Sequence, residues 1–451
     1  MNDEAARHAA RKAALIASMQ ALSHDEAAPL GLSKRSSNLF RDRANRKKRR
    51  LDLGEFDHVI EVDSAHGWVD VEGTTSYENL VDATLPHGVM PAVVPQLKSI
   101  TVGGAVAGIG IEATSFRHGL VHDTMLELDV LLPGGDILTC TPENEHRDLF
   151  FGFPNSYGTL GYALRVRLRT LPVKRFVRVE HRRYVGAHDF FNGLSAGCDE
   201  QADFVDGVVF GSELEVTNVA QFVDEAPWSS DYTFEQIYYR SLPDKPIDYM
   251  STRNYLWRWD TDWFWCSKNL GAQHPLVRRL LGRKRLNSRT YTRFMHWNAR
   301  WAVTKRLARL GGRHQESVIQ DVDIPIDRAD EFLAFLMREI GILPIWVCPI
   351  RSTDPAQHFP LYPLTPETVY FNFGFWDVVD SSVKHEIGYF NRLVEQEVFR
   401  LGGIKSLYSD CFFTREEFGR AYGMDQYATL KAKYDPREEM LGLYEKCVLR
   451  G

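Results

Sequence analysis

Glycine is concentrated in one run of the chain, PQLKSITVGGAVAGIGIEATSFRHGL, which covers residues 95–120. Four glycines fall within eight residues there: Gly103, Gly104, Gly108 and Gly110. Because glycine costs backbone entropy, this density indicates main chain that approaches another group closely or takes positive φ. The N–H groups of such a run can hold a diphosphate. Tight turns of a β-rich domain also use glycine, and the spacing is not the G-x-G-x-x-G of a Rossmann site.

Candidate groups for proton transfer and anion binding lie in the same run and near the C-terminus. Glu112 could serve a bound molecule, or its carboxyl could accept hydrogen bonds from nearby backbone N–H groups. Tyr408 and Asp410, in the run IKSLYSDC, could relay a proton or form a structural hydrogen-bonded pair. Lys405 could bind a carboxylate or phosphate. Arg351, after the run WVCPI, could face a substrate or form a surface ion pair.

A second glycine-containing run, FPNSYGTLG at residues 153–161, precedes the strand-like run YALRVRLRTLP. The two glycine runs and the chain between them contain an ordered set of motifs. These are T-x-G-G at Thr101–Gly104, H-G followed by Asp at His118, Gly119 and Asp123, G-G-D at Gly134–Asp136, and a run ending in G-x-L-G at Pro154–Gly161. In this order they resemble the second half of the PCMH-type FAD-binding domain of the vanillyl-alcohol-oxidase superfamily.

The resemblance implies an FAD cofactor. It implies non-covalent FAD, because no loop histidine stands in the family's attachment context, and it makes His118 a cofactor-loop residue rather than a base. The cofactor-binding residues that it implies are Pro95, Ile100, Thr101, Val102, Gly103, Gly104, Gly108, Gly110, Ser115, His118, Gly119, Asn155, Tyr157, Gly158, Gly161 and Tyr162.

Five further runs look like the delta-24 sterol reductase branch of the superfamily, over roughly residues 55–450. They are GIGIEATSFRHGL, ENEHRDLFFGFPNSYGTLGY, NYLWRWDTDWFW, ILPIWVCPI and GGIKSLYSDCFFTREEFG. The likeness extends to bacterial relatives that act on methylene- or methyl-branched fatty acyl chains, which share KRSSNLFR. It implies reduction of an isolated or methylene alkene of a branched fatty acyl chain, with NAD(P)H or a redox protein as electron donor.

Three alternatives stay open beside this reading. The same site could work in reverse and desaturate a methyl-branched acyl chain. A sugar or alcohol oxidase of the same superfamily is disfavoured by the lipid-branch motifs. A chain with a degenerate flavin fold could instead bind a membrane surface without chemistry.

The chemistry of an isolated alkene determines which groups the protein must supply for its reduction. Without a carbonyl to stabilise a carbanion, conjugate hydride addition is not available, whereas protonation of the less substituted carbon gives a tertiary cation that a hydride can quench. Such a site needs an acid, an anionic group near the cation and a dry pocket. Glu112, Tyr408 and Asp410 are the candidate catalytic residues, and Arg351 and Lys405 the candidate substrate-binding residues. Trp257, Trp259 and Trp263 are typical of a core but could line an apolar channel.

The elements around these residues predict an α+β fold. Alternating β-branched runs with a PGGD hairpin turn, and one helix near Tyr77–Leu85, fill the chain from Leu51 to Pro172. We predict a PCMH-type FAD-binding domain with a truncated first lobe, joined to an α+β substrate (cap) domain. The predicted segments are an N-terminal helical segment at 1–32, the FAD-binding domain at 33–173, the cap domain at 174–400 and a C-terminal segment at 401–451 that returns to the flavin.

Composition limits the partners. The net charge of −6 gives no argument for nucleic acid. The six cysteines are scattered without a C-x-x-C motif, which favours reduced thiols in the cytoplasm and predicts no metal site. The N-terminus does not resemble a secretory signal, and no run approaches the roughly 18 apolar residues of a spanning helix. Any membrane contact is therefore expected to be peripheral, at the inner face.

Two stretches are strongly basic. Residues 41–50 hold seven Lys or Arg, which usually means a solvated surface. Residues 274–313 hold twelve Lys or Arg and no Asp or Glu, interleaved with periodic Leu, Phe and Trp. This pattern fits a helix pair with a solvated basic face, and it also fits docking to a membrane or an acyl carrier.

The truncated first lobe leads to a prediction about the diphosphate. No G-x-G-x-x-G or G-G-G-H-S run precedes residue 95, so Ser33–Asn38 with Lys34 and Arg35 is the candidate replacement. The double substitution Lys34→Ala and Arg35→Ala should lower flavin occupancy, measured as the flavin absorbance released by acid precipitation. Unchanged occupancy would remove this hypothesis.

Overall fold

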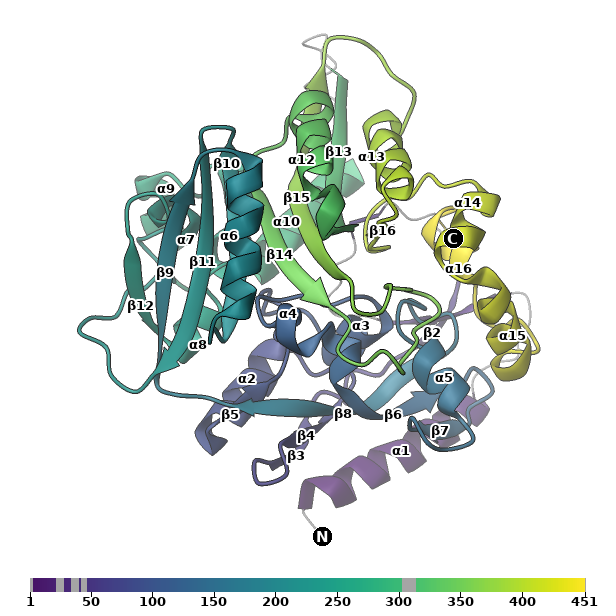
Figure 1. Cartoon of the computed structure of the whole chain (residues 1–451). Helices are drawn as coiled ribbons and strands as arrows, with labels where there is room; N and C mark the ends of the chain where they lie inside the picture. Colours follow the sequence, from purple (N-terminus) through teal and green to yellow (C-terminus); the bar gives the residue numbers. More distant parts are fainter. Residues whose placement is uncertain (1–2, 22–27, 34–39, 42–46, 302–313, 451) are drawn as a thin grey trace.

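The computed structural model describes residues 3–21, 28–33, 40–41, 47–301 and 314–450 (Figure 1). Two large antiparallel sheets organise the chain, one in each half. In Figure 1 the N-terminal half, purple to blue, lies below the teal and green sheet of the second half, and the yellow C-terminal helices lie beside both. The chain is α+β, as the sequence predicts.

The N-terminal part is small. Among the described residues before Gly54, it consists of helix α1 (Asp3–Ala21) and a parallel pair of three-residue strands, β1 (Leu30–Leu32) and β2 (Arg49–Leu51). Leu15, Leu30 and Leu51 share a buried cluster with Tyr162, which attaches this part to the first large sheet.

The first large sheet is antiparallel. Its strands are β3 (Val59–Asp63), β4 (Trp68–Glu72), β8 (Tyr162–Pro172), β6 (Met125–Leu131) and β7 (Ile137–Cys140) in spatial order, with β5 (Val89–Pro91) paired to β8. Short helices lie between its strands along the chain: α2 (Tyr77–Thr84), η1 (Leu85–His87), α3 (Val102–Ala107), α4 (Ser115–His118), η2 (Val121–Thr124) and α5 (Arg147–Gly152).

The glycine run corrects one expectation, because it is not only strand and loop. Residues Val102–Ala107 form helix α3 despite two glycines, since Thr101 caps the first turn and Val102 and Val106 are fully buried. Residues Ser115–His118 form a second short helix.

The second large sheet has eight antiparallel strands. Their spatial order is β12 (Ile247–Ser251), β9 (Phe176–Tyr184), β11 (Leu214–Val223), β10 (Phe204–Gly211), β14 (Ile345–Arg351), β15 (Val369–Ser381), β13 (His314–Pro325) and β16 (Ile404–Lys405). Helices α6 (Ala187–Asp199), α12 (Ala329–Phe335) and α13 (Tyr389–Arg400) cover one face, and the one-turn π-helix η6 (Leu336–Ile340) continues α12 (Figure 1). The opposite face is turned toward the first half of the chain.

The remaining helices lie in two groups. Helix α7 (Tyr238–Ser241) lies between β11 and β12. The segment between β12 and β13 contains α8 (Thr252–Leu256), η3 (Asp260–Asp262), η4 (Cys266–Leu270), α9 (Pro275–Leu281) and α10 (Ser288–Trp301). The short helix η5 (Ile326–Arg328) follows β13. The C-terminal group is α14 (Arg415–Ala421), α15 (Met424–Tyr434) and α16 (Leu443–Cys447). No described helix is long and apolar enough to span a bilayer.

A buried ion-pair network ties α1 to the first sheet. Asp129 on β6 accepts hydrogen bonds from Lys12 of α1 at 2.9 Å and from Arg165 of β8 at 2.9 Å, and Thr139 of β7 donates to it at 2.8 Å. Burial alone would raise the pKa of Asp129, but the hydrogen bonds and charges of Arg165 and Lys12 lower it to about 2. Because the folded-state pKa is depressed, this stabilisation exists above pH 4 and disappears as the pH falls toward 2.

Asp129→Asn should therefore destabilise the protein by about 2 kcal/mol at pH 7, and the difference from the unsubstituted protein should shrink as the pH falls from 4 to 2. Urea unfolding at a series of pH values measures both quantities. The exposed Glu225→Gln is the control and should change neither. A loss that is equal at all pH values would contradict the electrostatic explanation.

Candidate active site

The glycine run lies where the two halves of the chain meet. Helix α4 packs against β14 of the eight-stranded sheet (Figure 1). The Val205 N–H donates to the Ala113 carbonyl at 2.8 Å, and Cys348 Sγ donates to the Glu112 carbonyl at 3.2 Å. The backbone of residues 112–113 is therefore fixed to β10 and β14, the central strands of the cap sheet.

A row of polar side chains crosses the face of the cap sheet that is turned toward this run. Strand pairing places His181 opposite Asn218, Asn218 opposite Asp206, and Cys348 opposite Asn372, which stands opposite Asp323. Gly207 pairs with Val347; Asp206 directly precedes Gly207 and Cys348 directly follows Val347, so the antiparallel register brings Asp206 and Cys348 next to each other. All six are buried, and the residues that alternate with them along the strands pack under α6, α12 and α13. The sheet therefore has one apolar face, which packs against helices, and one face that carries buried polar side chains.

Glu112 joins this row through Arg258. The Arg258 guanidinium donates to Asp206 Oδ2 at 2.8 Å and to Glu112 Oε1 at 3.4 Å, and its plane lies 3.9 Å from the centre of the Tyr255 ring. Asn218 Nδ2 donates to Asp206 Oδ1 at 2.6 Å, and Trp346 Nε1 to its Oδ2 at 3.2 Å. Asp206 is therefore fully partnered, whereas Glu112 Oε2 has no hydrogen-bond partner among the described residues.

Burial and the neighbouring charges set the proton affinity of Glu112. Burial raises the pKa of the Glu112 carboxyl to about 7, the Arg258 charge opposes the rise, and the Asp206 charge adds to it. One guanidinium faces two buried carboxyl groups, so one of the two carries a proton near neutral pH. Asp206 forms the shorter ion pair with Arg258, at 2.8 Å against 3.4 Å for Glu112.

Tyr408 is the second candidate acid that the structure places in a buried network. Its hydroxyl accepts a hydrogen bond from Trp376 Nε1 at 2.6 Å and donates to Asp321 of β13. Burial raises the pKa of Asp321 to about 8, so this carboxyl also holds a proton near neutral pH. Asp321 stands opposite Gly374, two residues along β13 from Asp323 and on the same face of the sheet.

Unpartnered buried polar atoms test whether FAD fits between the halves. Among the described residues, the Asn155 Oδ1 and Ser156 Oγ atoms lack hydrogen-bond partners although both side chains are fully buried, as does Glu112 Oε2. Such atoms are costly unless a ligand or water satisfies them. The polar edge of a flavin offers both donors and acceptors to them. The residues present therefore fit the cofactor that the sequence implies.

The second glycine run is strained in a way that fits a ligand site. Asn155 and Tyr157 take positive φ values of 60° and 51°, followed by Gly158 at 67°. For a residue with a Cβ, this conformation costs about 1–2 kcal/mol. Strain of this kind persists where the surroundings determine the backbone and gathers at functional sites.

The first turn of α3 corrects the expectation that the glycine N–H groups are free for a diphosphate. The Val102 N–H donates to Thr75 O at 2.9 Å, the Gly103 N–H to Gly73 O at 2.8 Å, and the Gly104 N–H to Thr101 Oγ1 at 3.3 Å. A Cβ on Gly103 would lie 2.8 Å from the Gly73 carbonyl oxygen. These two glycines let α3 pack closely on the sheet.

Other predicted cofactor residues shape the loop itself. A Cβ atom on Gly110 would lie 2.5 Å from the Val121 side chain. A Cβ atom on Gly119, whose φ is 74°, would lie 2.6 Å from the Asp123 side chain, so both positions require glycine. From residue 107 to 112 the side chains alternate, so that Ile109 and Ile111 are half-buried while Gly108, Gly110 and Glu112 are buried. Ile109 and Ile111 offer an apolar surface on the accessible side of the loop.

The remaining predicted cofactor residues are buried or half-buried in the same half of the chain. They are Pro95, Ile100, Ser115, His118, Gly161 and Tyr162. Burial and the charges of Arg117 and Arg169 lower the pKa of His118 to about 4, so it is neutral near pH 7. A neutral ring agrees with a loop role for His118 rather than a charged one.

The C-terminal segment contacts the second glycine run. Lys446 donates to Tyr157 O at 2.7 Å and Lys431 to Thr159 O at 2.8 Å. Arg41 donates to Leu407 O at 2.8 Å and lies over the Tyr157 ring at 5.0 Å. Arg41 is buried, which differs from the solvated surface expected for residues 41–50; Lys34 and Arg35 lie outside the described residues.

Three predicted site residues, Lys405, Asp410 and Arg351, are not part of the hydrogen-bond network around Glu112. Lys405 is fully buried and donates to Asp410 O at 2.6 Å, Cys411 Sγ at 3.1 Å and Glu395 Oε1 at 3.4 Å, so its three N–H groups hold the C-terminal segment and leave none for a substrate. The Asp410 carboxylate lies 3.9 Å from Arg450, away from the Glu112 network. Arg351 is exposed at the end of β14.

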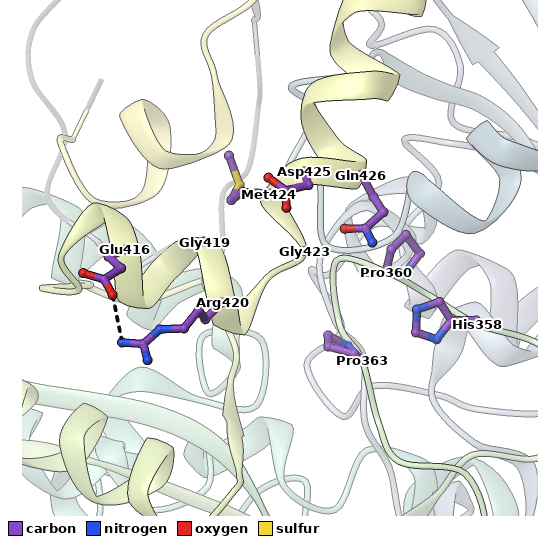
Figure 2. A pocket seen from close by; sticks show the side chains of 10 residues that line it. All are labelled: His358, Pro360, Pro363, Glu416, Gly419, Arg420, Gly423, Met424, Asp425 and Gln426. Carbon is purple, nitrogen blue, oxygen red and sulfur yellow. Dashed lines mark ion pairs between the residues drawn. The ribbon is translucent and has the colours of Figure 1, made fainter.

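A separate hollow of about 500 Å³ opens between the loop at His358–Pro363 and helices α14 and α15 (Figure 2). Figure 2 shows the ion pair of Glu416 and Arg420 at its rim. None of the predicted site residues lines this hollow, so it is not part of the candidate site.

Comparisons with known proteins agree with this geometry. A family described as FAD binding domain matches residues 6–141. The human Delta(24)-sterol reductase is 25% identical over 412 residues, covering 86% of this chain and 75% of the relative. The Arabidopsis thaliana Delta(24)-sterol reductase is 24% identical over 446 residues, covering 88% and 76%. Cytokinin dehydrogenase 7 of Oryza sativa subsp. japonica is 32% identical over 147 residues, 32% of this chain and 28% of the relative.

The fold, the family match and the relatives define the class: the chain is an FAD-dependent oxidoreductase with a PCMH-type FAD-binding domain. The chain acts on a carbon–carbon double bond, and over most of its length it is similar to the Delta(24)-sterol reductases. The non-catalytic alternative is not retained. When bound, FAD supplies hydride chemistry, and the chain supplies binding, orientation and protons.

Several residues of the site were not found from the sequence. They are Asp206, Arg258, Asp321, Asp323, Trp376 and Arg41. The sequence could have indicated three of them, because an acid inside an otherwise apolar strand pattern is unusual. These are Asp206 in VDGVVFG and Asp321 and Asp323 in VIQDVDIP. Arg258 stands among tryptophans in WRWD, where a buried cation needs a partner from elsewhere in the chain.

Replacing Asp206 should change the titration of Glu112. In Asp206→Asn, the charge that helps to raise the pKa of Glu112 is removed while Arg258 remains, so the carboxyl should ionise at lower pH. Infrared difference spectroscopy of the protonated-carboxyl band measures this, with Glu112→Gln as the assignment control. A band that titrates at the same pH in Asp206→Asn would contradict the proposed coupling.

Proposed function

We propose that the chain reduces an isolated or methylene double bond in a branched fatty acyl chain, with NAD(P)H as the electron source. The observation that carries the proposal is Glu112, a buried carboxyl at the junction of the halves with a pKa raised to about 7 and one unpartnered oxygen. An acid that keeps its proton at neutral pH is what an unactivated alkene requires.

The residues around Glu112 have separate tasks in this proposal. Glu112 Oε2 gives its proton to the less substituted alkene carbon, and the newly formed Glu112 carboxylate stabilises the positive charge on the other carbon. Arg258 holds both carboxyl groups in place, and Tyr255 and Tyr238 cover its guanidinium. The hydride that bound reduced flavin would supply completes the addition, and a proton from solvent restores the Glu112 carboxyl.

An aromatic wall excludes water from this region. Phe264 stacks on Trp259 with ring centres 4.9 Å apart and contacts Trp376 at 4.3 Å and Trp346 at 5.7 Å. Trp376 in turn donates to Tyr408. A wall of this kind suits a hydrocarbon substrate, and the pair of Tyr408 and Asp321 provides a second proton at its other end.

Two observations bear on the substrate. The relatives' printed names indicate reduction of a sterol and so support a lipid alkene, whereas only the run KRSSNLFR, which resembles bacterial relatives that act on branched acyl chains, supports an acyl substrate. Desaturation of a methyl-branched acyl chain uses the same residues in reverse, with Glu112 as base. A redox protein is the alternative electron donor. We place the chain in the cytoplasm, at the inner face of the membrane.

Lipid mass spectrometry of cells that express the chain tests the substrate and the direction. A gain of two hydrogens in a branched acyl chain supports the reductase. A loss of two hydrogens supports the desaturase, and a change confined to sterols would contradict the acyl substrate while leaving the enzyme class intact.

Glu112→Gln should lower product formation in this assay at least 100-fold, because loss of a general acid typically costs 10²–10⁴ in rate. Flavin absorbance should stay unchanged. Glu215→Gln is the matched control: Glu215 is also buried and its pKa is also raised by burial, but it accepts from the Gly186 N–H outside the network. Full activity of Glu112→Gln would remove Glu112 as the acid.

A further inference from the structure

Helix α9 (Pro275–Leu281) exposes apolar side chains and buries a charged one, the reverse of an ordinary surface helix. Its leucines face solvent, with Leu276 exposed by 69% and Leu280 by 83%, whereas Arg278 between them is only 3% exposed. Residues at positions i and i+4 share one face of a helix, so the two leucines protrude together. A water-soluble helix normally has the opposite distribution.

The protein fixes this orientation by binding Arg278. The guanidinium forms a buried ion pair with Asp262 and donates to the carbonyls of Phe234 at 2.7 Å and Gln236 at 3.4 Å. Burying an arginine is unfavourable unless it is paired and hydrogen-bonded, and here it is. Because Arg278 is held inward, the helix cannot rotate to bury Leu276 and Leu280.

The exposed leucines lie in a strongly cationic stretch of chain. Arg279, Arg283, Lys284 and Arg285 follow or flank them and are exposed. Glu235 lies 3.8 Å from Arg279 and Asp231 lies 2.9 Å from Arg283. No described residue forms an ion pair with Lys284 or Arg285, and His274–Arg313 contributes no acid of its own.

We propose that α9 and the turn after it dock on an anionic lipid surface, with Leu276 and Leu280 inserted among the acyl chains and Lys284 and Arg285 bound to phosphate groups. Protruding apolar side chains flanked by long cations are the pattern of interfacial helices. A protein partner would have to provide a pocket for two projecting leucines, whereas the interior of a lipid leaflet accepts them without one. The observations therefore favour the lipid surface over an acidic carrier protein.

The docking surface is connected to the candidate active site through contacts on its inner side. Asp262, which holds Arg278, precedes Trp263, and Trp263 stacks on Tyr291 of α10 at 6.2 Å. Phe40 contacts Trp263 at 5.6 Å and Tyr408 at 5.7 Å. The purpose of docking, delivery of a lipid to the aromatic wall, rests on the proposed function; the docking itself does not.

Vesicle co-sedimentation with the full-length, flavin-loaded protein tests the docking. Vesicles of phosphatidylcholine with one-third phosphatidylglycerol should bind the protein, and pure phosphatidylcholine should bind at least tenfold less. The double variant Leu276→Gln and Leu280→Gln should weaken binding at least tenfold, as should Lys284→Gln with Arg285→Gln. The matched control is Val383→Gln with Ile387→Gln, which removes two other exposed apolar side chains and should bind like the unsubstituted protein.

Two readouts separate docking from folding and from chemistry. Flavin absorbance and circular dichroism should be the same in all variants, because every substituted side chain is exposed. Equal vesicle binding by the leucine variant and its control would overturn the proposal, and so would binding to an acyl carrier protein with none to vesicles. Lipid turnover in detergent should persist in the docking variants, so a failure of the proposed reaction is seen independently of vesicle binding.

Discussion

The shared ion pair of Arg258 determines both how the two halves of the chain meet and which group holds a proton. A single buried guanidinium lies between Asp206 on the cap sheet and Glu112 on the glycine run. Breaking a buried pair leaves an uncompensated charge, which costs about 3–5 kcal/mol, so the halves are held in one register. Burial raises the pKa of Glu112 to about 7 against the opposing charge of Arg258, so a large share of this carboxyl keeps its proton near neutral pH.

The same sheet serves packing and chemistry because strand side chains alternate. Phe371, Phe373 and Phe375 of β15 pack under helices on one face, while Asn372 between them joins the polar row on the other. Asn372 donates to Asp323, which also accepts from Tyr362 at 2.6 Å, and burial raises the pKa of Asp323 to about 6. A one-residue shift in register would exchange the two faces, so the position of the acids depends on the apolar core behind them.

Sequence predicted the α+β class and the FAD-binding domain, but not the contacts within the candidate site. The glycine run could be proposed as a cofactor site because glycine density is a local signal, and Glu112 lies in that run. The partners of Glu112 could not be found, because Arg258 and Asp206 come from segments 146 and 94 residues away in the chain, and such pairing depends on the sheet topology. The free N–H groups expected at Gly103 and Gly104 are instead used by Gly73 and Thr101, which no local pattern reveals.

Cationic side chains hold the second glycine run and the C-terminal segment together. In the described structure, Arg41, Lys431 and Lys446 each donate to a main-chain carbonyl beside the strained second glycine run or the segment that faces it. A carbonyl that accepts from a buried cation is held more firmly than one that accepts from water, because charge-assisted hydrogen bonds are about twice as strong. The positive φ values of Asn155 and Tyr157 need such support. The C-terminal segment thus stabilises the loop at residues 153–161. Before residue 54 the described elements are only α1, β1 and β2.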